Sequence, residues 1–248
     1  MSLVTYPCFC YCIRSREYKE MPEQIKAVIF DIDGVLLDSL SIWKELGRRY
    51  ITNLGYQPVP DMDEILFPMS MEQGAAWLKD TFSLEDSQET IMRELEKEIQ
   101  FFYFEEVKAK SGAEELLQKL NKLGILAVAA TSSPREHVRK ALERNHLLSY
   151  LEAIYTTSEI GESKYSPKIY LTAAEFLKIN PCEILVAEDS LYALATAKNA
   201  GFQTAGIFDP VGEPEQKQLK NMADIYCQSL KDLMDYIEQN DLTENGGK

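Results

Sequence analysis

Short apolar runs alternate along the chain with longer segments in which apolar residues recur every three or four positions. The short runs are rich in β-branched residues and predict buried strands, whereas the longer periodic segments predict amphipathic helices. Repeated strand and helix with short connections predicts an α/β fold with a doubly wound parallel sheet, Rossmann-like in type. The predicted strands occupy residues 26–30, 125–130, 153–156, 183–187, 204–207 and 223–227.

Capping residues mark where two of the predicted helices begin and end. A helix over 113–123 is predicted to stop at Gly124, which is a favourable residue at a helix C-terminus. The next helix is predicted to begin after the second strand, with Ser133 as its N-cap, Pro134 at its first position and Glu136 completing a capping box. A strand therefore passes directly into a helix at this point.

One stretch interrupts the alternation. Residues 39–108 contain helix signals, such as the capping box Ser70-Met-Glu-Gln73, and no convincing strand. This predicts an all-α cap domain inserted after the first strand, where it would lie over the site as a lid. Trp43 and Trp77 could line the cap, but the default expectation is that they fill its core. The core domain is then formed by 23–38 together with 109–248.

The first residues look like an appendage to this fold. Met21-Pro22 could be an alternative start, so 1–22 is expected to be an N-terminal extension. It contains Cys8, Cys10 and Cys12, but neither a nearby His nor a CxxC pair completes a four-ligand metal pattern with them.

The amino-acid composition and net charge limit the classes of binding partner that we expect. The 248 residues are 45% apolar and carry a net charge of −14, which is ordinary for a globular protein and argues against nucleic acid or anionic membranes as partners. No run reaches the roughly 18 apolar residues of a membrane span, and the N-terminus lacks the pattern of a signal peptide. We therefore expect a cytoplasmic protein with reduced thiols; its oligomeric state is left open.

Polar residues follow three of the predicted strands: Asp31 and Asp33 after the first, Thr131 at the end of the second, and Glu188 with Asp189 after the fourth. In a parallel sheet these positions meet at one edge. Clustered carboxylates need a cation, and oxygen ligands without nearby His favour Mg²⁺. The hydroxyl of Thr131 and the ammonium group of Lys164 could bind an anionic oxygen group. Together with the carboxylates and the metal ion, they indicate a phosphoryl-transfer site.

These motifs resemble, in order and spacing, the four motifs of the haloacid dehalogenase superfamily, and the likeness runs from about residue 25 to 230. A helical insert between the first two motifs is similar to the subclass with an α-helical cap, which includes β-phosphoglucomutase and many small-molecule phosphatases. The segments that carry the resemblance are Asp31-Ile-Asp33-Gly34-Val-Leu-Leu-Asp38-Ser39, Thr131-Ser132-Ser133, Lys164 before Ser166-Pro167-Lys168, and Glu188-Asp189-Ser190.

The resemblance implies a role for each acid of the first motif. Asp31 would be the nucleophile and would form an aspartyl-phosphate. Asp33 would act as general acid toward the leaving oxygen and then as base toward water, a sequence that suits a two-step reaction. Its backbone carbonyl would also help to hold Mg²⁺.

The other motifs imply which residues bind the phosphoryl group, the substrate and the metal ion. Thr131 and Lys164 would bind the phosphoryl oxygens, and Ser132 and Gly34 would contact the substrate. Asp31, Asp33, Asp189 and Glu188 would form the metal site, with Glu188 either a ligand or in contact with one.

The expected activity is hydrolysis of a small phosphorylated metabolite by a Mg²⁺-dependent phosphatase. Dehalogenases and phosphonate hydrolases carry no aspartate at the position of Asp33. A sugar-phosphate mutase like β-phosphoglucomutase is the alternative, but the expected cap loop, 66–74, has no Arg or Lys to hold a second phosphate. A catalytically silent relative that binds a phosphorylated ligand or a protein is a further alternative. The substrate itself is left open.

The third motif departs from the family pattern. Tyr165 stands where the family usually has proline after the lysine, and Lys168 stands where it usually has aspartate. Lys168 is therefore a rival to Lys164, although Pro167 before it predicts that it lies in a helix and faces away.

Overall fold

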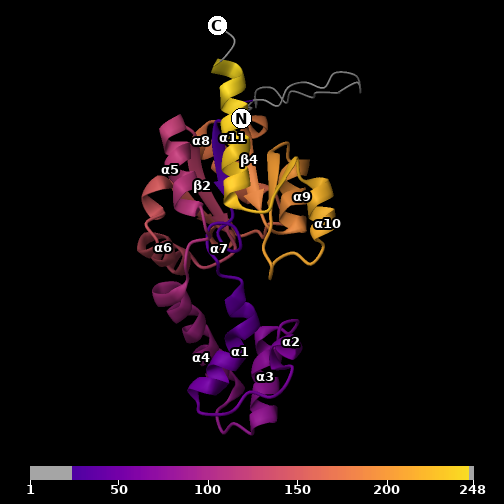
Figure 1. Cartoon of the computed structure of the whole chain (residues 1–248). Coiled ribbons are helices and arrows are strands. Elements are labelled where there is room, and N and C mark those ends of the chain that lie inside the picture. The colour runs from indigo at the N-terminus through magenta and orange to yellow at the C-terminus, as the bar shows by residue number, and fades with distance from the viewer. Residues whose placement is uncertain (1–23, 246–248) are drawn as a thin grey trace, which may run out of the picture.

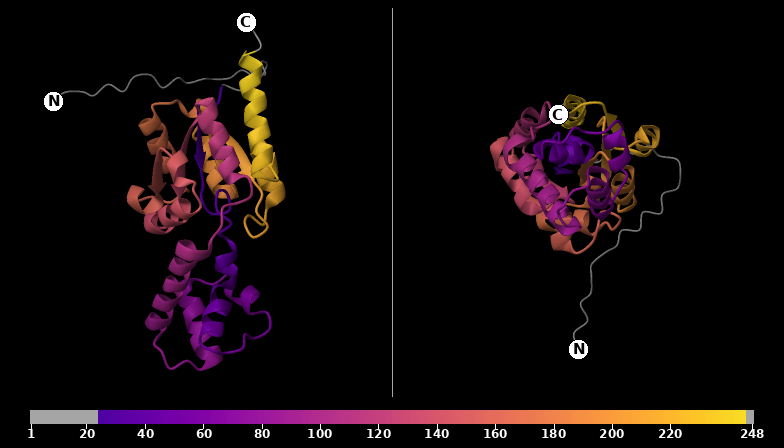
Figure 2. Two further views of the ribbon diagram at one scale, coloured as in Figure 1. Left: turned by 60° about the vertical axis from the view of Figure 1, so that its left-hand side comes forward. Right: turned by 90° about the horizontal axis from the view of Figure 1, so that it is seen from below.

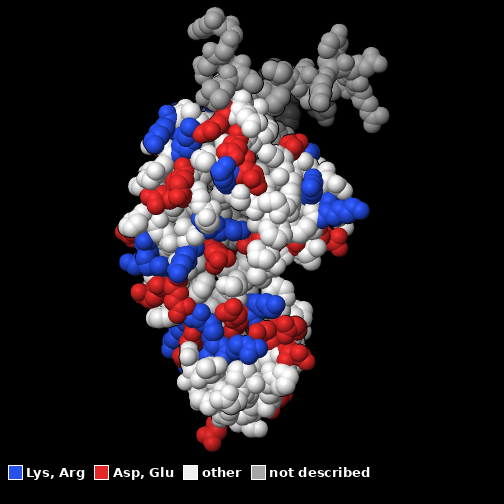
Figure 3. Space-filling model, in the orientation of Figure 1, with Lys and Arg blue, Asp and Glu red and all other residues white. Residues whose placement is uncertain are grey.

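A computed structural model of the chain describes residues 24–245. The predicted extension 1–22, with its three cysteines, lies outside the described residues. Within them, no helix is long and apolar enough to cross a membrane. On the face seen in Figure 3, acidic and basic side chains are interspersed over both parts of the molecule.

Six parallel strands form a single sheet in the order β3-β2-β1-β4-β5-β6. The predicted strands are confirmed, with ends that differ by one or two residues. Their bounds are β1 (Ala27–Phe30), β2 (Leu126–Thr131), β3 (Ala153–Thr156), β4 (Ile184–Glu188), β5 (Gln203–Ile207) and β6 (Ile225–Cys227).

Helices cover both faces of the sheet, as the two views of Figure 2 show. Successive residues of β1 point to opposite faces, so Val28 and Phe30 pack in one apolar cluster, and Ala27 and Ile29 in the other. The first cluster includes side chains of α5 (Ala113–Leu123), α6 (Arg135–Arg144) and α11 (Leu230–Asn245), and the second those of α8 (Lys168–Leu177) and α9 (Leu191–Asn199). The doubly wound fold is thus confirmed. Shorter helices complete the core: η2 (Leu148–Tyr150), α7 (Thr157–Ile160), η3 (Pro181–Glu183) and α10 (Gln216–Met222).

The strand order reverses at β1. The chain moves from β1 outward to β2 and β3, and then returns to the other side of β1 for β4, β5 and β6. Such a switch point, at the carboxyl ends of the strands, is where α/β proteins bind ligands. The strands β2, β1 and β4 are neighbours there, so their polar ends meet, as the sequence predicted.

The inserted segment forms the cap, which lies below the core in Figure 1 and in the left view of Figure 2 and is joined to it by two chain segments. Ser70 and Gln73 form the predicted capping box. The expectation that Trp43 fills the core is wrong, because 43% of this residue is exposed, whereas Trp77 is partly buried and packs against the core. The cap helices are α1 (Ser41–Asn53), α2 (Met62–Leu66), α3 (Met71–Phe82), α4 (Gln88–Phe101) and the π-helix η1 (Phe102–Glu106).

Candidate active site

A buried lysine lies between two carboxylates at the switch point. Lys164, in the loop before α8, is 2% exposed, and its Nζ lies 2.7 Å from Asp31 Oδ1 and 2.8 Å from Glu188 Oε1. The hydroxyl of Tyr170, on α8, donates to the same Glu188 oxygen at 2.7 Å. The backbone N–H of Ile32 donates to Asp31 Oδ1, which fixes that carboxylate from its own loop.

Three carboxylates gather around this lysine. Oxygens of Asp31, Glu188 and Asp189 lie within 4.8 Å of one another, and all three residues are buried. Since Lys164 supplies one positive charge, two negative charges are left uncompensated when all three carboxyl groups are ionised. Glu188 Oε2 is buried and has no hydrogen-bond partner among the described residues. An orphaned carboxylate oxygen beside two further carboxylates fits a divalent cation with oxygen ligands.

The crowding of like charge changes the acidity of these groups. Burial, together with the neighbouring carboxylates, raises the pKa of Asp31 well above its ordinary value against the opposing effect of Lys164. Burial and Glu188 raise the pKa of Asp189 to about 7. Burial alone would lower the pKa of Lys164, but Asp31 and Glu188 outweigh it and raise that pKa, so the lysine stays charged.

Asp33 has different partners. Its carboxylate accepts hydrogen bonds of 2.6 Å from the hydroxyls of Ser39, Tyr103 and Ser133. The hydroxyl of Thr131 is farther away, at 3.4 Å. The prediction that Ser133 caps α6 is wrong: Pro134 occupies the N-cap position without a side-chain cap, and the Ser133 hydroxyl is engaged by Asp33.

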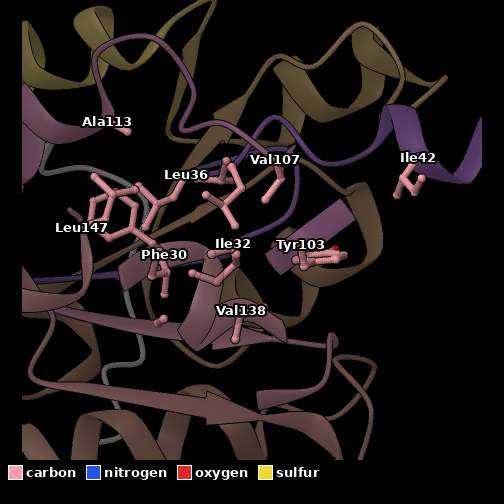
Figure 4. Packing of buried hydrophobic residues seen from close by; sticks show 14 of the residues in the cluster. Phe30, Ile32, Leu36, Ile42, Tyr103, Val107, Ala113, Val138 and Leu147 are labelled. Atoms are coloured by element: carbon pink, nitrogen blue, oxygen red, sulfur yellow. The ribbon is translucent and has the colours of Figure 1, made fainter. Parts of the chain in front are cut away.

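Tyr103 was not identified from the sequence as a site residue. It lies in η1, where the chain returns from the cap, and Figure 4 shows its ring among the apolar side chains of Ile32, Val107 and Val138. Burial and the Asp33 carboxylate raise its pKa, so the hydroxyl stays protonated and donates. Tyr103 belongs to the aromatic run Phe101-Phe-Tyr-Phe104, which by itself predicts packing. Only the fold brings its hydroxyl to a residue 70 positions earlier.

Two glycines leave room for the Asp189 carboxylate. A Cβ on Gly34, whose φ is +76°, would lie 2.7 Å from Asp189 Oδ2, and a Cβ on Gly212 would lie 2.9 Å from it. Lys110 supports the same loop, because its Nζ donates to the Gly34 carbonyl at 2.6 Å and lies 2.8 Å from Asp209. The sequence placed Gly34 at the substrate, whereas its close contact in the structure is with Asp189.

Residues 28–207 match the profile of the haloacid dehalogenase-like hydrolases, a span that covers more than half of the chain. The chain belongs to the haloacid dehalogenase-like hydrolase family. A phosphorylated carbohydrates phosphatase of Thermotoga maritima is 28% identical to it over 179 residues, which cover 72% of this chain and 83% of that protein. Hexitol phosphatase B of Escherichia coli K12 is 26% identical over 218 residues, covering 86% and 96%.

Solved structures support the fold of this hydrolase. A β-phosphoglucomutase-like protein from Thermotoga maritima superposes with a TM-score of 0.78 at 24% identity, covering 87% of this chain and 99% of that one. The family match and the phosphatase relatives together identify the chain as a hydrolase that acts on phosphate esters. The predicted family and fold are therefore confirmed.

Three other residues that the sequence singled out are exposed in the hydrolase. Ser132 is exposed. Lys168, the rival cation, is more than half exposed and its Nζ pairs with Glu162 at 2.8 Å. Tyr165, which stands where the family has proline, is 75% exposed and its ring stacks on Tyr192 with centroids 4.4 Å apart.

A cavity of about 490 Å³ opens between the cap and the core of the hydrolase. Tyr103 and Ser133, two of the hydroxyl donors to Asp33, are part of its wall. Arg93 and Lys97 of α4 also line it. The expected cap loop, 66–74, contains no Arg or Lys, and these two cations, which come from one face of a helix, were not predicted from the sequence.

Proposed function

We propose that this protein hydrolyses a small phosphorylated metabolite through an aspartyl-phosphate on Asp31, with Mg²⁺ as its cofactor. The observation that carries the proposal is the different surroundings of two acids that are two residues apart. Asp31 lies against the ammonium of Lys164, whereas Asp33 is held by three hydroxyls. Two carboxyl groups with different environments can take different roles in one reaction.

In the first step, a carboxylate oxygen of Asp31 attacks phosphorus, and the bond between phosphorus and the ester oxygen breaks. Asp33 gives a proton to the departing alcohol oxygen. In the second step, Asp33 takes a proton from water, the water oxygen bonds to phosphorus and the Asp31–phosphorus bond breaks. Lys164 and the hydroxyl of Thr131 would bind the phosphoryl oxygens.

The proposed metal ligands are Asp31, Glu188, Asp189 and the backbone carbonyl of Asp33. Support comes from the two uncompensated charges of the carboxylate cluster and from the orphaned Glu188 oxygen. Bound Mg²⁺ would offset the negative charge of the phosphate and of the carboxylates around it. Gly34 would keep the space in which the Asp189 carboxylate reaches the ion.

We further propose the domain limits expected from the sequence: 39–108 as the cap, and 23–38 with 109–248 as the core. A cap joined by two segments can close over the substrate and exclude water during the first step. A cytoplasmic location stays a prediction from the sequence.

A mutase is the second candidate, because Arg93 and Lys97 line the cavity between cap and core. Two cations there could hold the second phosphate of a bisphosphate intermediate. Glu96 lies on the same wall, and Lys97 already pairs with Glu94 at 2.8 Å, which weakens this candidate. Isomerisation of a sugar phosphate stimulated by its bisphosphate would establish the mutase.

Hydrolysis of 4-nitrophenyl phosphate by the full chain, with Mg²⁺ and with a chelator, tests the main proposal. Turnover is expected only with the metal, and Asp31→Asn is expected to abolish it. Asp38→Asn is the matched control, because Asp38 is an exposed acid of the same segment. Failure to hydrolyse any of a broad panel of phosphate esters would instead favour the catalytically silent relative.

A further inference from the structure

The cavity between cap and core is bordered by two residues that contact Asp33. Tyr103 and Ser133 line it and both donate to Asp33. If Asp33 protonates the leaving oxygen, the alcohol part of the substrate extends from Asp33 into this cavity. The residues that line the cavity therefore indicate whether that alcohol is polar or apolar.

Apolar and aromatic side chains make up about half of the residues that line the cavity. From the cap come Trp43, Met71, Ile99 and the Tyr103 ring, which lies against His137 of the core with centroids 5.5 Å apart. Trp43 is 43% exposed and lines this cavity. An apolar ligand that covers this indole would gain the free energy of removing it from water.

A second cavity of about 180 Å³ extends the apolar surface into the cap. It shares Trp43 and Met71 with the first and is also lined by Leu66 and Phe67, and the latter is 50% exposed. Ser70 lies on its wall as well, but its hydroxyl already accepts from the backbone of Gln73 and donates to Glu72. A polyol placed here would lose hydrogen bonds to water that these walls do not replace.

The charged lining residues lie on one helix of the cap. Arg93, Glu96 and Lys97 belong to α4, and all three are exposed. Charges of both signs on an exposed helix face select weakly between ligands. The apolar side chains that line the two cavities, in contrast, would discriminate between an apolar and a polar alcohol.

We propose that the leaving group is an alcohol with an apolar part, either an aromatic ring or a short alkyl chain, and that Trp43 and Met71 determine this specificity by contacting it. This rests on the proposed phosphatase function and makes it more specific. It also separates this protein from its relatives named for carbohydrate and hexitol phosphates, whose substrates carry many hydroxyls.

The test measures binding of n-alkylphosphonates of increasing length to the wild-type chain in Mg²⁺ by titration calorimetry. These compounds have a carbon–phosphorus bond in place of the ester bond, so binding is read without turnover. We expect Kd to fall about fourfold for each added methylene until the cavity is filled. A phosphonate of equal length with hydroxyls along its chain is expected to bind at least tenfold more weakly than the alkyl compound.

Trp43→Ala is expected to reduce the dependence of Kd on chain length by about half. Phe101→Ala is the matched control, because Phe101 is a cap aromatic, 52% exposed, that lines neither cavity. A Kd that does not depend on chain length in the wild-type chain, or hydroxylated and alkyl chains that bind equally, would overturn the inference even if simple esters are hydrolysed. Chain-length dependence without hydrolysis of any ester would uphold the apolar site and refute the phosphatase.

Discussion

Replacement of Gly34 by alanine tests how closely the loop after β1 fits around the Asp189 carboxylate. The new methyl group would lie 2.7 Å from Asp189 Oδ2 and 2.8 Å from Leu40 Cδ1, both well inside van der Waals contact. The backbone φ of +76° is also unfavourable for any residue with a Cβ. The substitution therefore adds steric overlap to backbone strain.

The two effects can be separated with a second glycine. Gly161 has the same φ of +76°, but a Cβ there would meet nothing within 4 Å. Gly161→Ala should cost only the strain of the left-handed conformation, about 1 kcal/mol. Gly34→Ala should cost this plus about 2 kcal/mol for overpacking, or about 3 kcal/mol in all.

Urea denaturation of the metal-free variants, followed by circular dichroism, measures this difference. At this chain length about 3 kcal/mol also corresponds to a fall in Tm of roughly 6 to 12 °C for Gly34→Ala, and the Gly161→Ala fall should be about a third of that. Because the methyl group displaces a proposed ligand, Gly34→Ala should in addition weaken Mg²⁺ binding. Equal destabilisation by the two substitutions would refute the close fit around Asp189.

Three further predictions follow from the contacts of the site. Tyr103→Phe removes one of three donors to Asp33 and should lower kcat about tenfold or more with KM little changed; an unchanged kcat would exclude a role in positioning this acid. Asp189 has a pKa of about 7 without metal, so it is protonated at lower pH, and calorimetry should show Mg²⁺ affinity falling between about pH 8 and pH 6; a constant affinity would contradict its role as a ligand. Lys164→Met leaves buried carboxylates unpaired and should destabilise the metal-free protein by about 3–5 kcal/mol, whereas the exposed Lys168→Met should cost less than about 1 kcal/mol; similar losses in urea denaturation would refute the distinction between the two lysines.

The fold could be predicted because its signals are local. Apolar β-branched runs gave the six strands, and the capping box at Ser70 gave the start of α3. The rule that parallel strands share a carboxyl edge then brought Asp31, Thr131 and Glu188 together without any knowledge of contacts.

The rest of the site depends on contacts between distant parts of the chain. Ser133 has the sequence context of a helix cap, and nothing near it indicates that its hydroxyl meets Asp33, 100 residues earlier. Trp43 looked like a core residue because its exposure depends on where the cap faces the core. Arg93 and Lys97 were not predicted, because a cation for a second phosphate was expected, if present, on the cap loop 66–74. In the structure both residues lie on the face of α4 that lines the cavity.

Chemical trapping of the proposed intermediate tests the central claim most directly. The full chain is mixed with 4-nitrophenyl phosphate and Mg²⁺, quenched in acid and reduced with borohydride, which converts an aspartyl-phosphate into homoserine. Peptide mass spectrometry should then find homoserine at position 31, dependent on substrate and absent from Asp31→Asn. Two results would contradict Asp31 as the nucleophile. One is continued turnover while position 31 remains aspartate in every trapped sample, and the other is homoserine at the position of another aspartate.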